Sequence, residues 1–412
     1  MSTEWPQVLG PLLRREDVDP ASLGAAMETI LAGEATDAQI AAFAVLLRAK
    51  GETPTELAAL IRAMLRFTNP VPLDPEGADG VIVDTCGTGG DRSHTFNVST
   101  LAAIVVAGAG VRVCKHGNRA ASSACGSADL LEALGVSLDV GPEGVAACVR
   151  EAGIGFCFAP RYHPALRFAA APRRELGVPT TFNFLGPLAN PARVRRQVVG
   201  VADPGMADRI VHTLAELGAS RAMVFFGHDG LDELTTTDVS TVCEYRNGEH
   251  RVWLLDPAEH GIARSTRDAL VGGDPAHNAA MARRLLGGEP GPVRDVVVLN
   301  AAAALVVADA APDLDAAIAL AGRTIDEGAA AAALDRLDHG GAQLAGGRVR
   351  IGVSETAQQI VGCGHVQGDN ALGKDARRRQ APIQFLPVVI GAENAARREP
   401  FDDAISVALH AD

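Results

Sequence analysis

Two rhythms of apolar and polar residues divide this chain near residue 75. Before that point, apolar residues recur every three or four positions, which is the period of an amphipathic α-helix. The capping boxes Thr36-Asp37-Ala38-Gln39 and Thr53-Pro54-Thr55-Glu56 precede two such stretches. The pattern predicts a small helical domain over residues 1–75, which ends in a proline-rich linker. Its leftover apolar faces are a candidate dimer interface, and packing against the rest of the chain is the alternative.

From residue 78 onward, short apolar runs alternate with helix-like stretches. The runs expected to form strands are 81–83, 111–114, 154–158, 198–201, 222–226 and 295–299. The helix-like stretches include 101–107, 128–134, 144–152 and 206–217. Such alternation is typical of α/β folds with a mostly parallel sheet. We therefore expect a larger α/β domain over residues 78–338, with ligands bound where the strands end.

Residues 160–192 interrupt this alternation with prolines and arginines, and we expect about 165–192 to cross back and complete the helical domain. Residues 339–412 follow as a carboxyl-terminal extension that fits no regular element. Its glycine, proline and charge content favours disorder over a folded domain. A lineage-specific interaction segment and an altered reading of the end of the chain are the alternatives.

Composition limits the partners that this chain is expected to bind. It carries 37 basic and 50 acidic residues, for a net charge of −13. An acidic surface repels the phosphates of nucleic acids and anionic lipids, so we expect no nucleic-acid or membrane partner. The amino terminus has no signal pattern, no apolar run reaches transmembrane length, and the seven cysteines are scattered. These features predict a cytoplasmic protein with reduced thiols.

A glycine-dense loop, Gly87-Thr88-Gly89-Gly90-Asp91, follows the first predicted strand. Glycines let the backbone approach a ligand closely and aim successive N–H groups at one point. Asn97-Val98-Ser99-Thr100 then opens the next predicted helix, whose free N–H groups and dipole favour an anion. Strand, loop and helix start in series favour an anion site over a plain turn.

A cationic loop, Lys115-His116-Gly117-Asn118-Arg119, follows the next predicted strand and supplies charge-assisted donors. A solvated surface turn is the alternative interpretation, but the loop directly follows an apolar strand. Two such loops at the ends of neighbouring strands would form one pocket floor. The expected ligand is a small phosphorylated molecule.

Two adjacent acids, Asp232 and Glu233, follow the strand expected at 222–226. In a loop both carboxylates can reach one side, and Mg²⁺ is typically held by one or two carboxylates plus substrate phosphates. Exposed turn acids are the alternative. The two neighbouring anion loops favour a magnesium site.

Together with the loop Asn183-Phe184-Leu185-Gly186-Pro187-Leu188-Ala189-Asn190-Pro191, these motifs resemble those of the anthranilate phosphoribosyltransferase family, in the family's order, over about residues 5 to 338. The resemblance implies a nucleoside phosphorylase/phosphoribosyltransferase-like fold and a homodimer through the helical domain. It also implies transfer of the phosphoribosyl group of 5-phosphoribosyl 1-pyrophosphate (PRPP) to the amine of anthranilate in tryptophan biosynthesis, with release of pyrophosphate.

The resemblance further implies a role for each matched residue. Lys115 and Arg173 would be the catalytic residues, and the Arg173 guanidinium fork would hold the anthranilate carboxylate. Ser99, Asp232 and Glu233 would hold Mg²⁺. The substrate-binding residues would be Gly87, Gly89, Gly90, Asp91, Thr95, Asn97, Ser99, Thr100, Lys115, His116, Asn118, Ser127, His163, Arg173, Gly186 and Pro187. Of these, the anthranilate pocket would comprise Asn118, His163, Arg173, Gly186 and Pro187, with His116 close by.

Two other functions stay open. A pyrimidine nucleoside phosphorylase shares the implied fold, but its glycine loop has an additional glycine before the aspartate, and it adds a carboxyl-terminal domain. A nucleic-acid-binding relative that has lost catalysis is opposed by the net charge of −13 and by the intact acidic pair.

Overall fold

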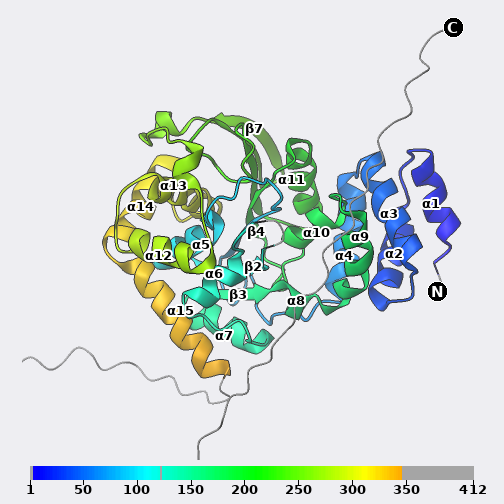
Figure 1. Cartoon of the computed structure of the whole chain (residues 1–412), viewed down its shortest axis with the longest axis horizontal. Coiled ribbons are helices and arrows are strands. Elements are labelled where there is room, and N and C mark those ends of the chain that lie inside the picture. Colours follow the sequence, from blue (N-terminus) through cyan, green and yellow to red (C-terminus); the bar gives the residue numbers. More distant parts are fainter. Residues whose placement is uncertain (1–2, 121–122, 346–412) are drawn as a thin grey trace, which may run out of the picture. The chain divides into compact units, whose positions relative to one another are not determined.

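The computed structural model describes residues 3–120 and 123–345. The described residues begin with the helices α1 (Trp5–Leu13), α2 (Pro20–Ala32), α3 (Asp37–Lys50) and α4 (Pro54–Arg66). Three later segments pack against this bundle (Figure 1): η1 (Pro164–Ala169) contacts α2, α9 (Ala170–Leu176) contacts α3, and α10 (Phe182–Leu188) contacts α4. Apolar side chains of the bundle and of these later segments share one core.

Both predicted capping boxes are confirmed. The Thr36 hydroxyl accepts from the Gln39 backbone N–H, and the Gln39 side chain accepts from the Thr36 N–H at 2.8 Å. Thr53 and Glu56 form the same reciprocal pair. Each box satisfies amide groups that the first helical turn leaves free, which fixes where α3 and α4 begin.

The described strands form a single seven-stranded sheet in the order β3-β2-β1-β4-β5-β6-β7. Their bounds are β1 (Ile82–Gly87), β2 (Arg112–Gly117), β3 (Ile154–Phe158), β4 (Arg196–Gly200), β5 (Arg221–Gly227), β6 (Ser240–Arg246) and β7 (Glu249–Leu255). Strands β1 to β5 pair in parallel, and β6 and β7 are antiparallel to their neighbours. The predicted fold class, a small helical domain plus a larger α/β domain with a mostly parallel mixed sheet, is confirmed.

Helices cover both faces of the sheet. Successive side chains of a strand point to opposite faces, so Val198 of β4 packs with α5 (Val98–Gly108) and α13 (Pro292–Val307), whereas Val199 packs with α11 (Ala207–Glu216) and the bundle. The remaining helices are α6 (Ser127–Ala133), α7 (Pro142–Glu151), α8 (Ala159–Tyr162), α12 (Pro275–Leu286), α14 (Leu314–Asp326) and α15 (Ala329–Ala345), with 3₁₀ turns η2 (Pro204–Met206), η3 (Pro257–His260) and η4 (Arg267–Leu270). The second face therefore joins the sheet to the amino-terminal bundle.

One prediction about the strands was wrong, and two strands were not predicted. Residues 295–299 lie inside α13, where the valine run is helical because it starts behind Pro292 and is buried on nearly every side, so it shows no period. The hairpin of β6 and β7 was missed, although its turn Asn247-Gly248 has both φ angles positive, at 49° and 90°. An Asn-Gly pair is the usual signal of such a turn.

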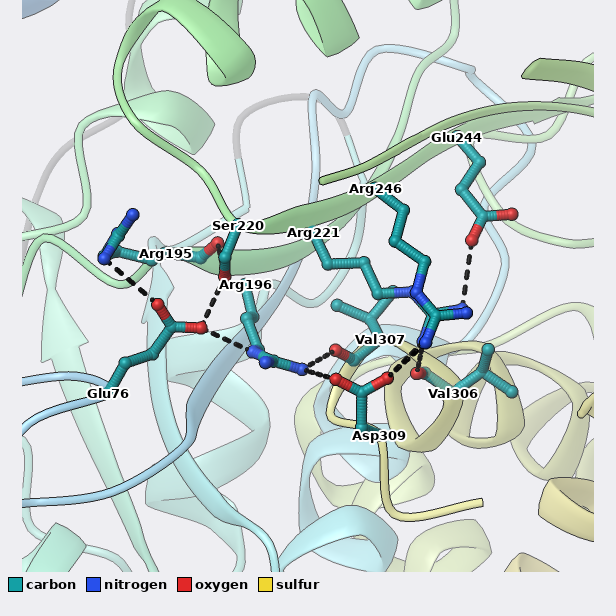
Figure 2. Close-up of polar contacts among 10 residues, drawn as sticks. All are labelled: Glu76, Arg195, Arg196, Ser220, Arg221, Glu244, Arg246, Val306, Val307 and Asp309. Carbon is teal, nitrogen blue, oxygen red and sulfur yellow. Dashed lines mark hydrogen bonds and ion pairs between the residues drawn. The ribbon is translucent and has the colours of Figure 1, made fainter. Parts of the chain in front are cut away.

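A network of charged side chains lies at the amino edge of the sheet (Figure 2). Arg196 contacts both Glu76 of the linker and Asp309. Arg221 contacts Asp309 at 2.7 Å, Glu244 at 3.0 Å and a carbonyl at the carboxyl end of α13. Guanidinium groups at a helix carboxyl terminus satisfy free carbonyls and favour the helix dipole. The network therefore ties α13 to β4, β5 and β6.

The expectations for residues 346–412 lie outside the described residues. Helix α15 runs to Ala345 and so passes the predicted boundary at residue 338. Within the described part of the chain, no helix combines the length and apolar character needed to cross a membrane.

Candidate active site

The glycine loop and the cationic loop meet at the carboxyl edge of the sheet. Strands β1 and β2 pair in parallel and end at Gly87 and Gly117, so the loops that follow them are neighbours. Strand order also reverses here, because β2 and β3 lie on one side of β1 and β4 lies on the other. A crevice at such a switch point is where open α/β sheets bind ligands.

The glycine loop is folded around Asp232. Gly89 and Gly90 have positive φ angles of 66° and 86°, and the Gly89 N–H donates to Asp232 Oδ2 at 2.7 Å. A Cβ on Gly87 would lie 2.6 Å from the same carboxylate, and one on Gly200 would lie 1.6 Å from the Asp232 carbonyl oxygen. Glycine at the ends of β1 and β4 therefore lets the acidic loop sit against the glycine loop.

The acidic pair is buried rather than exposed, which excludes the interpretation as turn acids. Asp232 and Glu233 are each only 9% exposed. Burial and the nearby Asp91 raise the pKa of Asp232 to about 6, and burial with Asp232 raises the pKa of Glu233 well above its usual value. Asp91 Oδ2 is also buried without a hydrogen-bond partner. The carboxyl groups of Asp91, Asp232 and Glu233 therefore lie near one another without enough positive charge to balance them.

A divalent cation would balance this negative charge, and the oxygen atoms present are suitable ligands for Mg²⁺. Carboxylate and hydroxyl oxygens are the hard ligands that it prefers. Among the described residues no three His, Cys, Asp or Glu side chains form a metal-holding group. A magnesium ion at this site would thus need further oxygens from substrate or water, which is its usual mode of binding beside phosphates.

Lys115 connects the two loops. Its ammonium group donates to the Thr85 carbonyl and to Ser99 Oγ at 3.3 Å, and the residue is 2% exposed. Burial lowers the pKa of Lys115, and the carboxylates of Asp84 and Glu233 oppose that shift. A cation therefore lies beneath the glycine loop, next to the start of α5.

Sequence reasoning missed Asp84 and Asn190, which hydrogen-bond to each other and, through Asp84, to the backbone of the cationic loop. Asp84 accepts from the Asn190 side chain at 2.7 Å and from the His116 backbone N–H at 3.1 Å, and burial raises its pKa. The sequence signal for Asp84 was an acidic residue inside an apolar strand. A fully buried carboxylate is rare without partners, so such a residue indicates a specific polar contact. Asn190 lies more than a hundred residues away, and only the fold reveals the pair.

The cationic loop carries less charge than its sequence indicates. Burial lowers the pKa of His116 to about 3 and that of His163 to about 4, so both rings are neutral at pH 7. Arg119 forms ion pairs with Asp129 at 2.8 Å and with Glu132. Of the charge-assisted donors expected in this loop, burial keeps His116 neutral and Arg119 donates to two carboxylates of α6, so Lys115 remains as the buried cation of this loop.

The two histidines mark a second half of the site. Their ring centroids are 5.0 Å apart, and each Nε2 is buried without a hydrogen-bond partner. His116 Nδ1 donates to the Gly186 carbonyl at 3.0 Å, since a carbonyl can only accept. His116 Nε2 is then an unused acceptor. This contact brings the predicted Gly186–Pro187 segment of α10 beside the cationic loop.

Arg173 of α9 provides an uncompensated cation beside the start of α10. Its guanidinium lies 5.6 Å from the centre of the Phe182 ring and forms no ion pair among the described residues. The side chain is half-buried, which strengthens any charged hydrogen bond that it makes. Such a group suits a carboxylate ligand.

The remaining predicted residues surround the glycine loop in different ways. Thr95 forms an isolated β-bridge, and both ends of the Asn97 side-chain amide bind other parts of the chain. Thr100 is fully buried, and its hydroxyl has no partner. Asn118 is exposed in the cationic loop, and Ser127 begins α6. The Asn97 side chain is thus held by the chain itself and the Thr100 side chain is enclosed, whereas Asn118 faces solvent.

A helical bundle that shares a core with an α/β domain, with glycine, cation and acid loops at one sheet edge, defines a class of glycosyl-transferring enzymes. Residues 6–68 match the family model described as "Glycosyl transferase family, helical bundle domain", and residues 79–331 match "Glycosyl transferase family, a/b domain". The chain belongs to the anthranilate phosphoribosyltransferase family.

Similarity to individual relatives supports this assignment. The chain is 54% identical to the anthranilate phosphoribosyltransferase of Salinispora arenicola over 337 residues, which are 81% of this chain and 95% of the relative. It is 53% identical to that of Rhodococcus jostii over 341 residues, which cover 81% and 92%. The crystal structure of the Thermus thermophilus enzyme aligns with a TM-score of 0.76 at 42% identity, covering 81% of this chain and 99% of that chain. The Saccharomyces cerevisiae enzyme in complex with PRPP and Mg aligns with a TM-score of 0.76 at 26% identity, covering 84% and 99%.

Proposed function

We propose that this chain is the enzyme that transfers the phosphoribosyl group of PRPP to the amine of anthranilate, releasing pyrophosphate, in tryptophan biosynthesis. The observation that carries the proposal is the 2.7 Å contact between the Gly89 N–H and Asp232 Oδ2, which joins the glycine loop to the acidic loop. Glu233 of the acidic loop also interacts electrostatically with Lys115. A pyrimidine nucleoside phosphorylase and a non-catalytic nucleic-acid binder are not favoured, because the relatives at about half identity are anthranilate phosphoribosyltransferases.

PRPP would bind in the half of the site built on β1, β2 and α5. Backbone N–H groups of the glycine loop and of the start of α5 would donate hydrogen bonds to phosphate oxygens. The residues proposed to contact PRPP are Gly87, Gly89, Gly90, Asp91, Thr95, Asn97, Ser99, Thr100, Lys115 and Ser127. Ser99, Asp232 and Glu233 would hold Mg²⁺, which, when bound, supplies charge neutralisation for pyrophosphate. Mg in complex with PRPP is described for the yeast relative.

Anthranilate would bind in the half built on α8, α9 and α10. Arg173 would hold its carboxylate, and the neutral His116 Nε2 would accept a hydrogen bond from its amine. His163, Asn118 and the Gly186–Pro187 backbone would complete the pocket. A homologue has been crystallised with 4-fluoroanthranilate.

These groups favour catalysis by position and charge rather than by a covalent intermediate. Departure of pyrophosphate leaves positive charge on the ribose carbon, while Lys115 opposes the negative charge that develops on the leaving group. The amine needs only to be held on the opposite face of the ribose. Bond formation leaves an acidic ammonium on the aromatic amine, whose proton can pass to the released pyrophosphate or to water. No strong base is required, which agrees with two histidines whose lowered pKa values make them weak bases.

We further propose that the protein is a cytoplasmic homodimer that associates through its helical domain. The proposed domains are residues 1–75 with the crossing segment 165–192, residues 78–338, and the extension 339–412. A dimer contact through the bundle would leave the carboxyl edge of the sheet free for both substrates.

The activity is tested by the fluorescence of anthranilate during incubation of pure full-length protein with PRPP and Mg²⁺. Turnover that requires all three components is expected. Phosphorolysis of thymidine or uridine without any consumption of anthranilate would show that the chemistry belongs to the alternative enzyme. A gel shift with nucleic acid and no turnover would support the binding protein instead.

A further inference from the structure

A cavity that neither histidine lines lies beside Leu188, the last residue of α10. Its volume is about 390 Å³, within the range of roughly 300–1,000 Å³ that small-molecule sites occupy. Helix α4 supplies one wall, α11 and the start of β4 supply the opposite wall, and the segment after α10 closes it. None of the residues proposed for PRPP, anthranilate or Mg²⁺ lines this cavity.

Four arginines line the cavity, and among its described lining residues there is no aspartate or glutamate. Arg66 forms an ion pair with Glu28, and Arg195 forms one with Glu76 at 3.2 Å (Figure 2). The other two arginines, Arg62 and Arg193, have no carboxylate partner within the described part of the chain.

The two uncompensated arginines differ in how they are held. Arg62 Nη2 donates to the Glu216 backbone carbonyl at 2.7 Å, so its guanidinium is anchored at the rim between α4 and α11. The Glu216 carboxylate is itself engaged by Thr55 at 2.7 Å. Arg193 has a positive φ of 52°, and its side chain forms no hydrogen bond or ion pair with any described residue. Both guanidinium groups can therefore receive an anion.

The rest of the lining is largely apolar. Leu65 of α4, Leu188 of α10 and Leu214 of α11 contribute side chains from three elements. A pocket that combines an apolar wall with a few convergent charged groups orients a ligand by its head group and binds its body by burial. Inorganic anions alone would leave that wall unused.

We propose that this cavity is a regulatory site for a small organic anion, a carboxylate or phosphate ester with an apolar body. Its head group would lie between Arg62 and Arg193, and its body against the leucines. Guanidinium forks match both kinds of oxyanion, and charged hydrogen bonds of this type are among the strong ones. The ligand would contact the bundle and the sheet domain together.

Two buried side chains connect this cavity to the anthranilate half of the active site. Gln197 lines the cavity and donates to the Pro187 carbonyl at 3.2 Å. Asn190 also lines it and donates to Asp84, which in turn holds the His116 backbone. A ligand that shifts either side chain would move the α10 segment or the cationic loop. The ligand should therefore change the binding of anthranilate more than the binding of PRPP, an expectation that rests on the proposed function.

Binding is tested by calorimetric titration of the full-length protein with 1-naphthoate, using the neutral 1-naphthamide for comparison. We expect saturable binding of 1-naphthoate only. Arg62→Gln and Arg193→Gln should each weaken it roughly tenfold, the loss of one charged hydrogen bond. Arg323→Gln, a change on the exposed face of α14, should leave it unchanged. The Arg193 side chain forms no hydrogen bond or ion pair within the described part of the chain, so its variant separates binding from stability.

Several outcomes would overturn the proposed site. They are the absence of saturable binding, equal binding of the amide, or affinity that Arg193→Gln and Arg62→Gln leave intact. Loss of binding in Arg173→Ala alone would locate the probe in the anthranilate pocket instead. None of these results depends on catalytic turnover.

The coupling is tested by steady-state kinetics with saturating 1-naphthoate. We expect the KM for anthranilate to change by about fivefold or more, the lower range of allosteric coupling, with a smaller change in the KM for PRPP. Arg193→Gln should keep its own kinetic constants and lose this response. An unchanged KM despite calorimetric binding would overturn the regulatory role, whereas absence of any turnover would count against the proposed function alone.

Discussion

At the scale of single residues, the active site depends on charges that burial makes strong. Lys115, Asp232 and Glu233 are each less than 10% exposed, and Glu233 interacts electrostatically with both of the others. Low exposure strengthens each charge and also leaves the acids uncompensated until a cation or substrate arrives. The motif residues could be named from the sequence because their types and order are distinctive. Their burial and their neutral histidine neighbours could not.

Arg173 should contribute mainly to the binding of anthranilate. We expect Arg173→Ala to raise the KM for anthranilate between about tenfold and a hundredfold, the loss of a charged hydrogen-bonded pair, with little change in the KM for PRPP. Steady-state kinetics with each substrate varied in turn measures both constants. Arg174→Ala, the exposed neighbour on α9, is the matched control and should change neither constant. Equal increases for both substrates would contradict the carboxylate role.

At the scale of elements, local signals placed most helices and strands correctly. Capping boxes fixed the starts of α3 and α4, and the apolar runs located β1 to β5. The run 295–299 was misjudged because a helix buried on all sides and a buried strand look alike over five residues. Strand β7 was missed because it is an edge strand with exposed polar and apolar residues, so no alternation marks it.

The amino-edge network should contribute to the stability of the α/β part. Arg221 is 5% exposed, and it is shared between Glu244 and the end of α13. Glu244 keeps Arg251 as a partner, but Arg221→Met removes the buried donors to Glu244 and to the α13 carbonyl. Because a hydrogen bond to a charged group contributes about 1.5–3 kcal/mol, this change should lower the free energy of unfolding by about 3 kcal/mol. Urea denaturation measures this change.

The matched control for that experiment is Arg246→Met. The Arg246 side chain is 55% exposed and lies 3.4 Å from Asp309, so its removal should cost less than about 1 kcal/mol. Equal losses of stability in the two variants would mean that burial does not govern the strength of this network.

At the scale of the whole molecule, the bundle leaves apolar side chains in solvent. Leu13 of α1 is 68% exposed and Val45 of α3 is 37% exposed, and these two helices pack together. An apolar face on a bundle that already shares its core with the sheet suits a second copy of the chain. A homodimer of this kind is a proposal that the sequence already favoured.

Light scattering of the full-length protein should therefore report a dimer, and Leu13→Glu should shift it toward the monomer, because a charge cannot be buried in an apolar contact without a partner. Val252→Glu, at a 63% exposed position on β7, should leave the dimer intact. A monomeric wild type, or a dimer that only Val252→Glu disrupts, would exclude association through the bundle.

The sequence by itself determined the α/β rhythm, the two loops at neighbouring strand ends and the family. Each of these depends on residues that are close along the chain, where periodicity, capping and motif spacing can be read directly. Only the tertiary structure decided that Asp232 meets Gly89, that Asn190 supports Asp84, and that four arginines surround a second cavity. Those contacts join segments up to about 140 residues apart, and the burial that sets their charges exists only after both faces of the sheet are covered.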